Sequence, residues 1–303
     1  MRQFVLTQNL AKDGTLWING KDFKYLAQVL RLKTGDTIQA RLPDGGLCQL
    51  ELVIKEKNRL LLSKIKDVQP ALSQNAEENS ETVAGSTYVG GVKAENVEQS
   101  DQLIEENGAV RGFGTAIWLL QCMPKAAKFD SVIRQCTEIG VEKIFPVLSD
   151  RSVYAKSDGD GNKVERWNRL IKEARQQSAS PVNTRIFSPQ KMNAVLQNLQ
   201  TSIENITNST NNDDFKICKL VLTEAPLDKK TLHEFLAEKP KLVVLAVGSE
   251  GGISPDELNQ LYDCGFKPLH LQCNVLRAET AAIYAVSSVQ ILMTECAKWL
   301  PNA

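Results

Sequence analysis

The sequence lacks the features of several other protein classes. No apolar run approaches the roughly 20 residues needed to span a bilayer, so we expect no membrane segment. The first residues, Met1–Gln8, are too short and too polar for a secretory signal, and we expect a cytoplasmic protein. The seven cysteines include no C-x-x-C pair, which predicts reduced, mostly buried thiols and no metal site.

Two enzyme signatures are also absent. The G-x-G-x-x-G fingerprint of nicotinamide-binding domains does not occur, and the glycine-rich turn that is present lies near the C-terminus. The two histidines, His233 and His270, have no triad-like companion, so we assign them no catalytic role.

The formal net charge is zero, which by itself argues against an RNA-binding protein. The charges are unevenly distributed, however, because residues 71–110 hold eight acidic side chains and one basic one, Lys93. The rest of the chain therefore carries 35 basic and 28 acidic residues, a net charge of +7. A positive excess suits a phosphate-binding surface, although a solvated lysine-rich face has the same composition.

The chain divides by composition into three parts. Residues 1–68 alternate apolar segments with turn signals, which predicts a small β-rich domain with one amphipathic helix, Lys21–Leu30. Residues 69–111 are acidic and polar, and they predict a disordered linker or insertion. Residues 112–303 form the third part, in which 201–215 read as a second polar insertion.

The third part alternates strands and helices. Apolar segments typical of buried strands lie at Ala116–Cys122, Lys143–Leu148, Thr184–Phe187, Lys219–Thr223, Leu242–Val247 and Pro268–Gln272. Helical patterns lie at Lys128–Ile139, Val164–Ser178, Pro189–Leu199, Lys230–Glu238, Pro255–Cys264 and Ala278–Lys298. Near-continuous apolar strands joined by helices predict an α/β fold, a parallel sheet covered on both faces. The pattern alone favours an open doubly wound sheet.

The stretch Leu242–Ala285 holds the strongest functional signal. A glycine turn follows an apolar strand, and Ser254-Pro255-Asp256-Glu257 then combines a capping box with proline at the first helical position. Such a turn lets a ligand approach the backbone closely. Taken alone, the glycines fit equally well a tight turn that binds nothing.

Several segments together resemble the ribosomal small-subunit methyltransferase E family, part of the SPOUT class. The similar segments keep the order and spacing of the family from residue 1 to about 298, and they are Tyr25–Asp36, Thr137–Val141, Asp150–Ser152, Glu173–Ser178, Gly248–Ser254 and Leu276–Ala281. The resemblance implies a SPOUT-type parallel sheet with a C-terminal trefoil knot, preceded by a PUA-like RNA-binding β-barrel. It also implies S-adenosylmethionine as cofactor and N3 of a uridine in 16S rRNA of the small ribosomal subunit as target.

The resemblance assigns site residues at the carboxyl ends of three strands. It places the cofactor against Leu222, Thr223, Val247, Gly248, Glu250, Gly251, Gly252, Leu271, Val275, Leu276 and Thr280. For catalysis we select Arg277, a permanent cation that can stabilise charge on the uracil or grip a phosphate. Glu279 is the second candidate, to orient Arg277 or to help remove the proton, or simply to fix the loop.

Basic side chains supply the candidates for RNA binding. These are Arg2 and Arg31 in the first part of the chain and Lys125, Lys128, Arg151, Arg166 and Arg169 in the third. On the helix Val164–Ser178, a solvated charged face is an equally good interpretation. The family further implies a homodimer packed through Ala278–Lys298, whose apolar side holds Ala281, Ala282, Ala285, Val289 and Leu292; an ordinary core helix is the alternative.

The sequence departs from the family pattern at several positions. Ser249 replaces the proline of the glycine turn, Gln272 replaces a glycine after the last strand, and Cys136 and Ser180 stand where basic residues are usual. Cofactor binding is therefore better supported than the identity of the target. The alternatives are a SPOUT methyltransferase with another RNA target, or a non-catalytic RNA-binding or ribosome-assembly protein that retains the fold.

Overall fold

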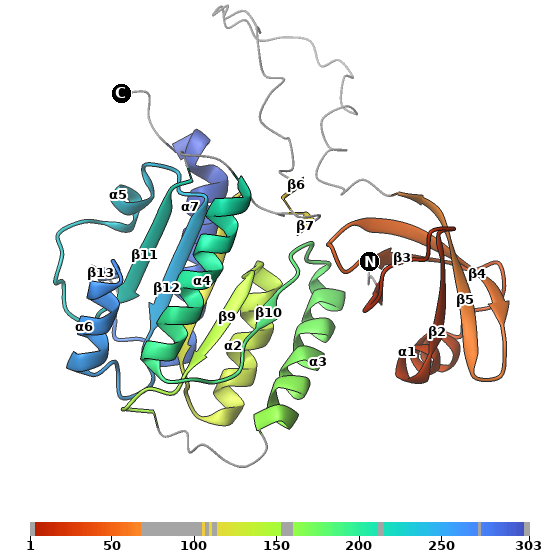
Figure 1. The fold of residues 1–303 in the computed structure, drawn as a ribbon, viewed down its shortest axis with the longest axis horizontal. Helices are drawn as coiled ribbons and strands as arrows, with labels where there is room; N and C mark the ends of the chain where they lie inside the picture. Colours follow the sequence, from red (N-terminus) through yellow and green to blue (C-terminus); the bar gives the residue numbers. More distant parts are fainter. Residues whose placement is uncertain are drawn as a thin grey trace, which may run out of the picture. The chain divides into compact units, whose positions relative to one another are not determined.

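The computed structural model describes residues 4–67, 105–106, 109–110, 114–152, 160–210, 215–271 and 274–299. The chain forms two compact units, centred on Leu6–Ile104 and on Glu105–Ala303 (Figure 1). Arg2 and most of the acidic segment 69–111 lie outside the described residues. Within that segment, β6 (Glu105–Glu106) and β7 (Ala109–Val110) pair as a short antiparallel ladder.

The first sheet has five strands in the order β1-β3-β4-β5-β2, and all but β1 belong to the N-terminal unit. Its strands are β1 (Phe4–Val5), β2 (Thr15–Asn19), β3 (Thr37–Arg41), β4 (Leu47–Lys55) and β5 (Arg59–Asp67). Alternate residues of β4 and β5 point inward, and Leu50, Leu52, Leu60 and Leu62 are fully buried. This confirms the predicted β-rich domain, in the form of a curled sheet.

The helix predicted over Lys21–Leu30 is present, but its second half is π-helical. α1 (Gly20–Lys24) passes into a π-helical segment, η1 (Tyr25–Val29), and the Leu30 amide donates to the Tyr25 carbonyl oxygen five residues back. The wider turn changes the angle between successive side chains, so the apolar face is buried only in part. Leu26 is fully buried, whereas Leu30 is 42% exposed.

Six parallel strands form the sheet of the C-terminal unit, as predicted. β8 (Ala116–Cys122) and β12 (Leu242–Val247) are paired at its centre, and every residue of both is buried. The order is β10-β9-β8-β12-β11-β13, with β9 at Lys143–Val147, β10 at Arg185–Ile186, β11 at Ile217–Leu222 and β13 at Lys267–Leu269. The trefoil knot stays a prediction from the resemblance.

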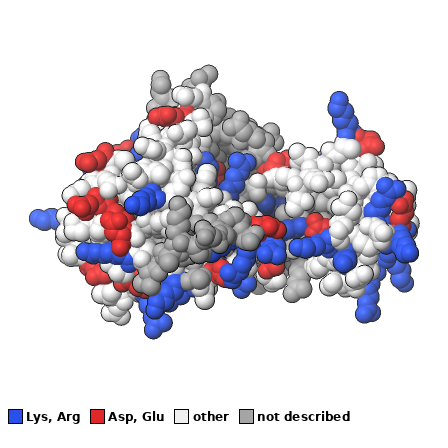
Figure 2. Space-filling view, turned by 60° about the horizontal axis from the view of Figure 1, so that its bottom comes forward, with Lys and Arg blue, Asp and Glu red and all other residues white. Residues whose placement is uncertain are grey.

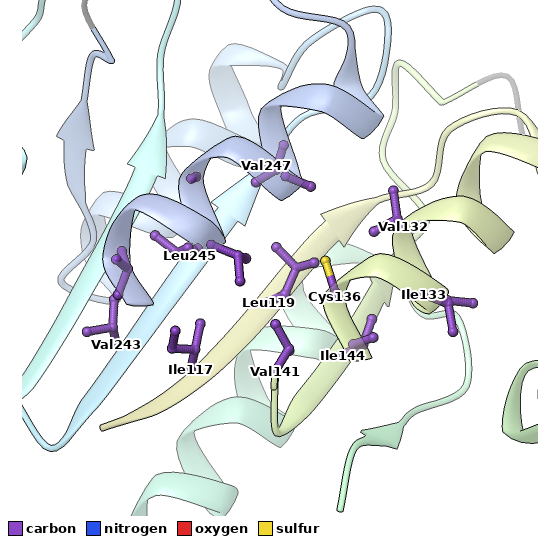
Figure 3. Packing of buried hydrophobic residues seen from close by; sticks show 14 of the residues in the cluster. Ile117, Leu119, Val132, Ile133, Cys136, Val141, Ile144, Val243, Leu245 and Val247 are labelled. Carbon is purple, nitrogen blue, oxygen red and sulfur yellow. The ribbon is translucent and has the colours of Figure 1, made fainter. Parts of the chain in front are cut away.

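Helices cover both faces of this sheet. One core cluster joins the sheet to α2 (Ala126–Ile139), α3 (Asp160–Ser178), α5 (Leu232–Leu236) and α7 (Ala278–Trp299). The other joins it to α4 (Met192–Thr210) and α6 (Pro255–Asp263). Figure 3 shows part of the first cluster, in which Leu119 of β8 and Val247 of β12 lie on the side of the sheet that carries Val132 and Cys136 of α2. No helix in the described part of the chain is long and apolar enough to span a membrane.

Three expectations about the helices need correction. The polar insertion predicted at 201–215 is largely helical, because α4 continues to Thr210 and buries Ile203 against the sheet. The charged face considered for the helix Val164–Ser178 does not include Arg175, which is 4% exposed and donates from Nη1 to Asn183 Oδ1 at 2.7 Å. On α7, the residues Ala282, Ala285 and Val289 are fully buried in their own core cluster, so they are not available to a partner.

Candidate functional site

A cavity of about 660 Å³ opens where β11, β12 and β13 end. Its walls come from the loops that follow these three strands, together with Arg151 from the loop after β9 and Ala281 from α7. Most residues predicted to hold the cofactor line it, namely Leu222, Thr223, Val247, Gly248, Glu250, Gly251, Gly252, Leu271, Val275 and Leu276. Arg277 also lines it, whereas Glu279 and Thr280 do not.

The glycine turn after β12 is shaped by close backbone contacts. A Cβ on Gly248 would lie 3.1 Å from the backbone of Gly252, and Gly252 itself has a left-handed φ of 74°. A Cβ on Gly251 would lie 3.0 Å from the Arg151 carbonyl oxygen. Packing within the chain therefore requires glycine at these positions, independently of any ligand. The sequence alone left this alternative open.

The loop after β9 is fastened to this turn by side-chain hydrogen bonds. Arg151 Nη1 donates to the Gly251 carbonyl oxygen at 3.3 Å, and Ser249 Oγ donates to the Arg151 carbonyl oxygen at 3.3 Å. The hydroxyl of Ser254 donates to Asp150 Oδ2 at 3.2 Å. Ser249, which departs from the family proline, thus has a structural role that sequence reasoning missed.

Glu257 stabilises the same two loops through hydrogen bonds of its buried carboxylate. It completes the predicted capping box of α6, in which the Ser254 side chain accepts from the Glu257 amide. Its carboxylate also accepts hydrogen bonds from Ser149 Oγ at 3.0 Å and from the Asp150 amide at 3.1 Å. The side chain is only 3% exposed, and the burial of a carboxylate is tolerable because several donors satisfy it. The capping-box motif located Glu257 but did not indicate these longer-range bonds.

A buried amide supports the start of the glycine turn from β8. Gln121 is fully buried, and its Nε2 donates to the carbonyl oxygens of Cys122 at 2.9 Å and Gly248 at 3.1 Å. Burial and the nearby Glu257 carboxylate raise the pKa of the neighbouring Cys122 thiol to about 12, although hydrogen bonds to the thiol act in the opposite direction.

Lys128 connects two walls of the site. Its ammonium lies 3.0 Å from Glu250 Oε1 in the glycine turn and 3.4 Å from Glu279 Oε2 in the first turn of α7. The pKa of Lys128 is raised, mainly by its hydrogen bond to Glu250. For Glu250, burial acts to raise the pKa, but hydrogen bonds from backbone amides and Lys128 outweigh it and lower the pKa overall. Lys128 is therefore engaged within the protein rather than free for RNA.

His270 follows β13 and contacts the end of β11 at another part of the cavity wall. The Thr223 amide donates to the Leu269 carbonyl oxygen at 2.9 Å, and His270 Nδ1 lies 3.2 Å from the Thr223 carbonyl oxygen. His270 also lines the cavity. This contact could not be predicted from the sequence, because it depends on the pairing of two strands that are distant in the chain.

The remaining predicted RNA-binding residues belong to both units. Lys125, Arg151 and Arg169 are exposed in the C-terminal unit, and Arg31 is exposed in the N-terminal unit with a left-handed φ of 55°. Arg166 is paired with Asp130. On the opposite side of α3, a stripe of apolar residues is buried, namely Trp167, Leu170, Ile171 and Ala174. Among the described residues, no group of three or more potential metal ligands is found.

Comparison with known proteins identifies the class of fold. Residues 113–290 match the model of an RNA methyltransferase domain, and residues 18–65 match that of an RNA methyltransferase PUA domain. One similar structure is described as a ribosomal RNA small subunit methyltransferase E from Neisseria gonorrhoeae bound to S-adenosyl methionine. Its TM-score is 0.68 at 19% sequence identity, and the match covers 96% of this chain and 98% of that chain. A putative methyltransferase from Legionella pneumophila, in complex with the same cofactor, has a TM-score of 0.67 at 20% identity, with 95% and 96% covered.

Two curated proteins named ribosomal RNA small subunit methyltransferase E are similar in sequence. The Bacillus subtilis protein is 23% identical over 93% of this chain and 92% of its own length. The Synechocystis protein is 27% identical over 63% of this chain, a match that spans only 58% of that relative. The chain belongs to the RNA methyltransferase family of the ribosomal RNA small subunit methyltransferase E type.

Proposed function

We propose that this chain transfers a methyl group from S-adenosylmethionine to N3 of a specific uridine in 16S rRNA of the small ribosomal subunit. The observation that carries the proposal is the cavity after β11, β12 and β13, because its walls include the glycine turn, Leu271 and residues 274–277. Two structural relatives are described with S-adenosylmethionine bound. The names of the curated relatives support rRNA of the small subunit as the target.

The residues of the cavity fit this cofactor. A volume of about 660 Å³ lies in the range of small-molecule sites. Val247, Leu271 and Leu276 offer an apolar surface suited to an adenine ring, and the glycine turn exposes backbone groups for the polar parts. Glu224 and Glu250 provide carboxylates for hydroxyl or ammonium groups.

The transfer requires positioning and charge stabilisation from the protein. S-adenosylmethionine supplies an electrophilic methyl group. Uracil N3 is a nucleophile once its imide proton is lost, and negative charge then spreads onto the ring oxygens. Arg277, an exposed cation at the cavity, would stabilise that charge or bind the target phosphate. Glu279 would orient Arg277 or receive the proton, although its ion pair with Lys128 competes with both roles.

Charge supports an RNA-binding role for the N-terminal unit. Residues 4–67 contain 11 basic and 7 acidic side chains. Figure 2 shows Lys and Arg interspersed with Asp and Glu over the face in view, rather than gathered into one stripe. We assign RNA contacts to Arg31, Lys125, Arg151 and Arg169, which are exposed. Lys128 and Arg166 would contribute less, because each is in an ion pair.

A homodimer through α7 is part of the proposal. The apolar residues first expected at the interface are buried in their own core, but the same helix exposes Tyr284 by 48% and Ile291 by 53%. Large apolar side chains exposed on one helix suit contact with a second chain. Sedimentation of the wild type and of the double variant Tyr284→Ser, Ile291→Ser tests this; a dimer unaffected by both changes would place the interface elsewhere.

The function is tested by incubating the protein with labelled S-adenosylmethionine and with small subunits from a strain that lacks the modification. Naked 16S rRNA and large subunits serve as alternative substrates. We expect label in the 16S rRNA of small subunits. Cofactor binding without label in any RNA would instead support a non-catalytic RNA-binding protein, and label in another RNA would support a retargeted enzyme.

A further inference from the structure

The group formed by Lys128, Glu250 and Glu279 has more negative than positive charge. One ammonium serves two carboxylates, at 3.0 and 3.4 Å, so the formal charge of the group is −1. Within the described residues, this ammonium is the one polar partner that Glu279 Oε2 has, and that atom is buried. The Glu250 carboxylate has a second donor, the Lys125 amide at 3.5 Å. The excess charge is therefore only partly neutralised.

This group lies at the wall of the cofactor cavity. Glu250 lines the cavity directly, and Glu279 follows Arg277 and Ala278, which line it too. The three side chains are 31%, 27% and 19% exposed, for Lys128, Glu250 and Glu279 respectively. The charged residues of the lining, Arg151, Glu224, Glu250 and Arg277, are exposed, whereas Lys128 and Glu279 behind them are partly buried. Because solvent screens exposed charges more strongly, the buried Glu279 carboxylate should be the least screened negative charge at this wall.

The proposed reaction removes a positive charge from the cavity. The S–CH₃ bond breaks with its electron pair left on sulfur, the methyl carbon bonds to deprotonated N3, and the imide proton passes to solvent. S-adenosylmethionine, with sulfonium, ammonium and carboxylate, carries a net charge of +1. S-adenosylhomocysteine, its thioether product, is neutral overall. Cofactor and product therefore differ in net charge, and a nearby group of charge −1 attracts the cation but not the neutral product.

We propose that the Lys128–Glu250–Glu279 group makes the cavity prefer the sulfonium cofactor to its neutral thioether product. This inference rests on the proposed function. The consequence is that product leaves and fresh cofactor enters without strong product inhibition. In this role Glu250 and Glu279 determine specificity electrostatically, and Lys128 limits the excess charge while joining the glycine turn to α7.

The test compares the Kd of S-adenosylmethionine with that of S-adenosylhomocysteine by calorimetry at low salt. Glu250→Gln and Glu279→Gln should each lower the preference for S-adenosylmethionine by about three- to tenfold, as expected for one unit charge several ångströms away in a partly solvated site. Lys128→Met should change the preference in the opposite direction, because two carboxylates are then unopposed. Glu238→Gln, which removes an exposed carboxylate that does not line the cavity, is the control and should leave the ratio unchanged.

Opposite signs for the lysine and glutamate variants separate electrostatics from damage to the site, and thermal unfolding confirms that each variant is folded. The preference should also decrease at higher salt in the wild type. An unchanged ratio in both glutamine variants, or a shift of the same sign in Lys128→Met, would overturn the inference while leaving the proposed function intact. Failure of the wild type to bind S-adenosylmethionine would instead refute the proposed function.

Discussion

Arg151 packs directly against Gly251: its Nη1 donates to the Gly251 carbonyl oxygen at 3.3 Å, and a Cβ on Gly251 would lie 3.0 Å from the Arg151 carbonyl oxygen. Two loops that are 100 residues apart in the sequence therefore fit together only with glycine at this position. Because both residues line the cavity, the shape of the cavity depends on this contact.

Replacing Gly251 with alanine should deform the site. The added methyl group must displace backbone rather than a flexible side chain, and overpacking of this kind costs about 1–3 kcal/mol. We expect a lower Tm and at least a tenfold weaker affinity for S-adenosylmethionine in titration calorimetry. Gly265→Ala is the control, since that glycine has a φ of 84° but open space around it. It should lower the Tm without changing the affinity; an equal loss of affinity in both would contradict the explanation.

The two capping boxes of the C-terminal unit allow a second comparison. Glu257 is buried and binds the loop after β9 as well as its own helix, whereas Glu234 caps α5 at the surface. The Glu257 carboxylate accepts hydrogen bonds from three donors, and Glu257→Gln replaces one of its oxygens with an amide NH₂ group that cannot accept. We therefore expect the free energy of unfolding to decrease by about 2 kcal/mol. Glu234→Gln should cost far less. Urea denaturation measures both, and equal losses would show that capping alone matters.

The sequence predicted the parallel sheet, its helical cover and the position of the cavity because these depend on local apolar patterns and strand ends. It did not predict the π-helical segment at Tyr25–Val29, in which Leu26 is fully buried. Nor did it predict the fastening of Arg151 to Gly251 or the ion pairs of Lys128, because these join segments distant in sequence. Lys128 was selected for its charge, and only the fold shows which carboxylates surround it.

The cysteines should differ sharply in reactivity. Burial is the main cause that raises the pKa of Cys122 and Cys136 to about 12, whereas Cys264 is exposed. Alkylation at pH 8 followed by peptide mass spectrometry should label Cys264 and leave the two buried thiols unmodified until the protein is unfolded in urea. Rapid labelling of Cys122 in the folded protein would contradict the packing around β8.

The raised pKa values of these two thiols predict that the protein is less stable at alkaline pH. The folded pKa of about 12 exceeds the ordinary value of 9.0, so their contribution is complete below about pH 9. It decreases as the pH rises from 9 toward 12, because the unfolded chain releases these protons first. The Tm should therefore decrease above pH 9, and Cys136→Ala should reduce the steepness of that decrease. An identical pH dependence in this variant would exclude the thiol as a cause.

Arg277 should affect turnover rather than cofactor affinity. Arg277→Ala removes a cation proposed to act on the uracil or the phosphate, and we expect at least about a 100-fold lower methylation rate. The Kd of S-adenosylmethionine should change by less than about threefold, which calorimetry can measure. Arg277→Lys keeps the charge but loses the planar fork, so its rate should be intermediate. Unchanged turnover in Arg277→Ala would remove this residue from the mechanism.

The most direct test of the central claim is to map the methylated nucleoside. Small subunits from a strain lacking the modification are incubated with the protein and S-adenosylmethionine, and the 16S rRNA is digested and analysed by mass spectrometry. We predict one N3-methyluridine at a single position, which is absent when Arg277→Ala replaces the wild type. Methylation of another base, of the ribose, or of no site in the 16S rRNA would contradict the proposed function.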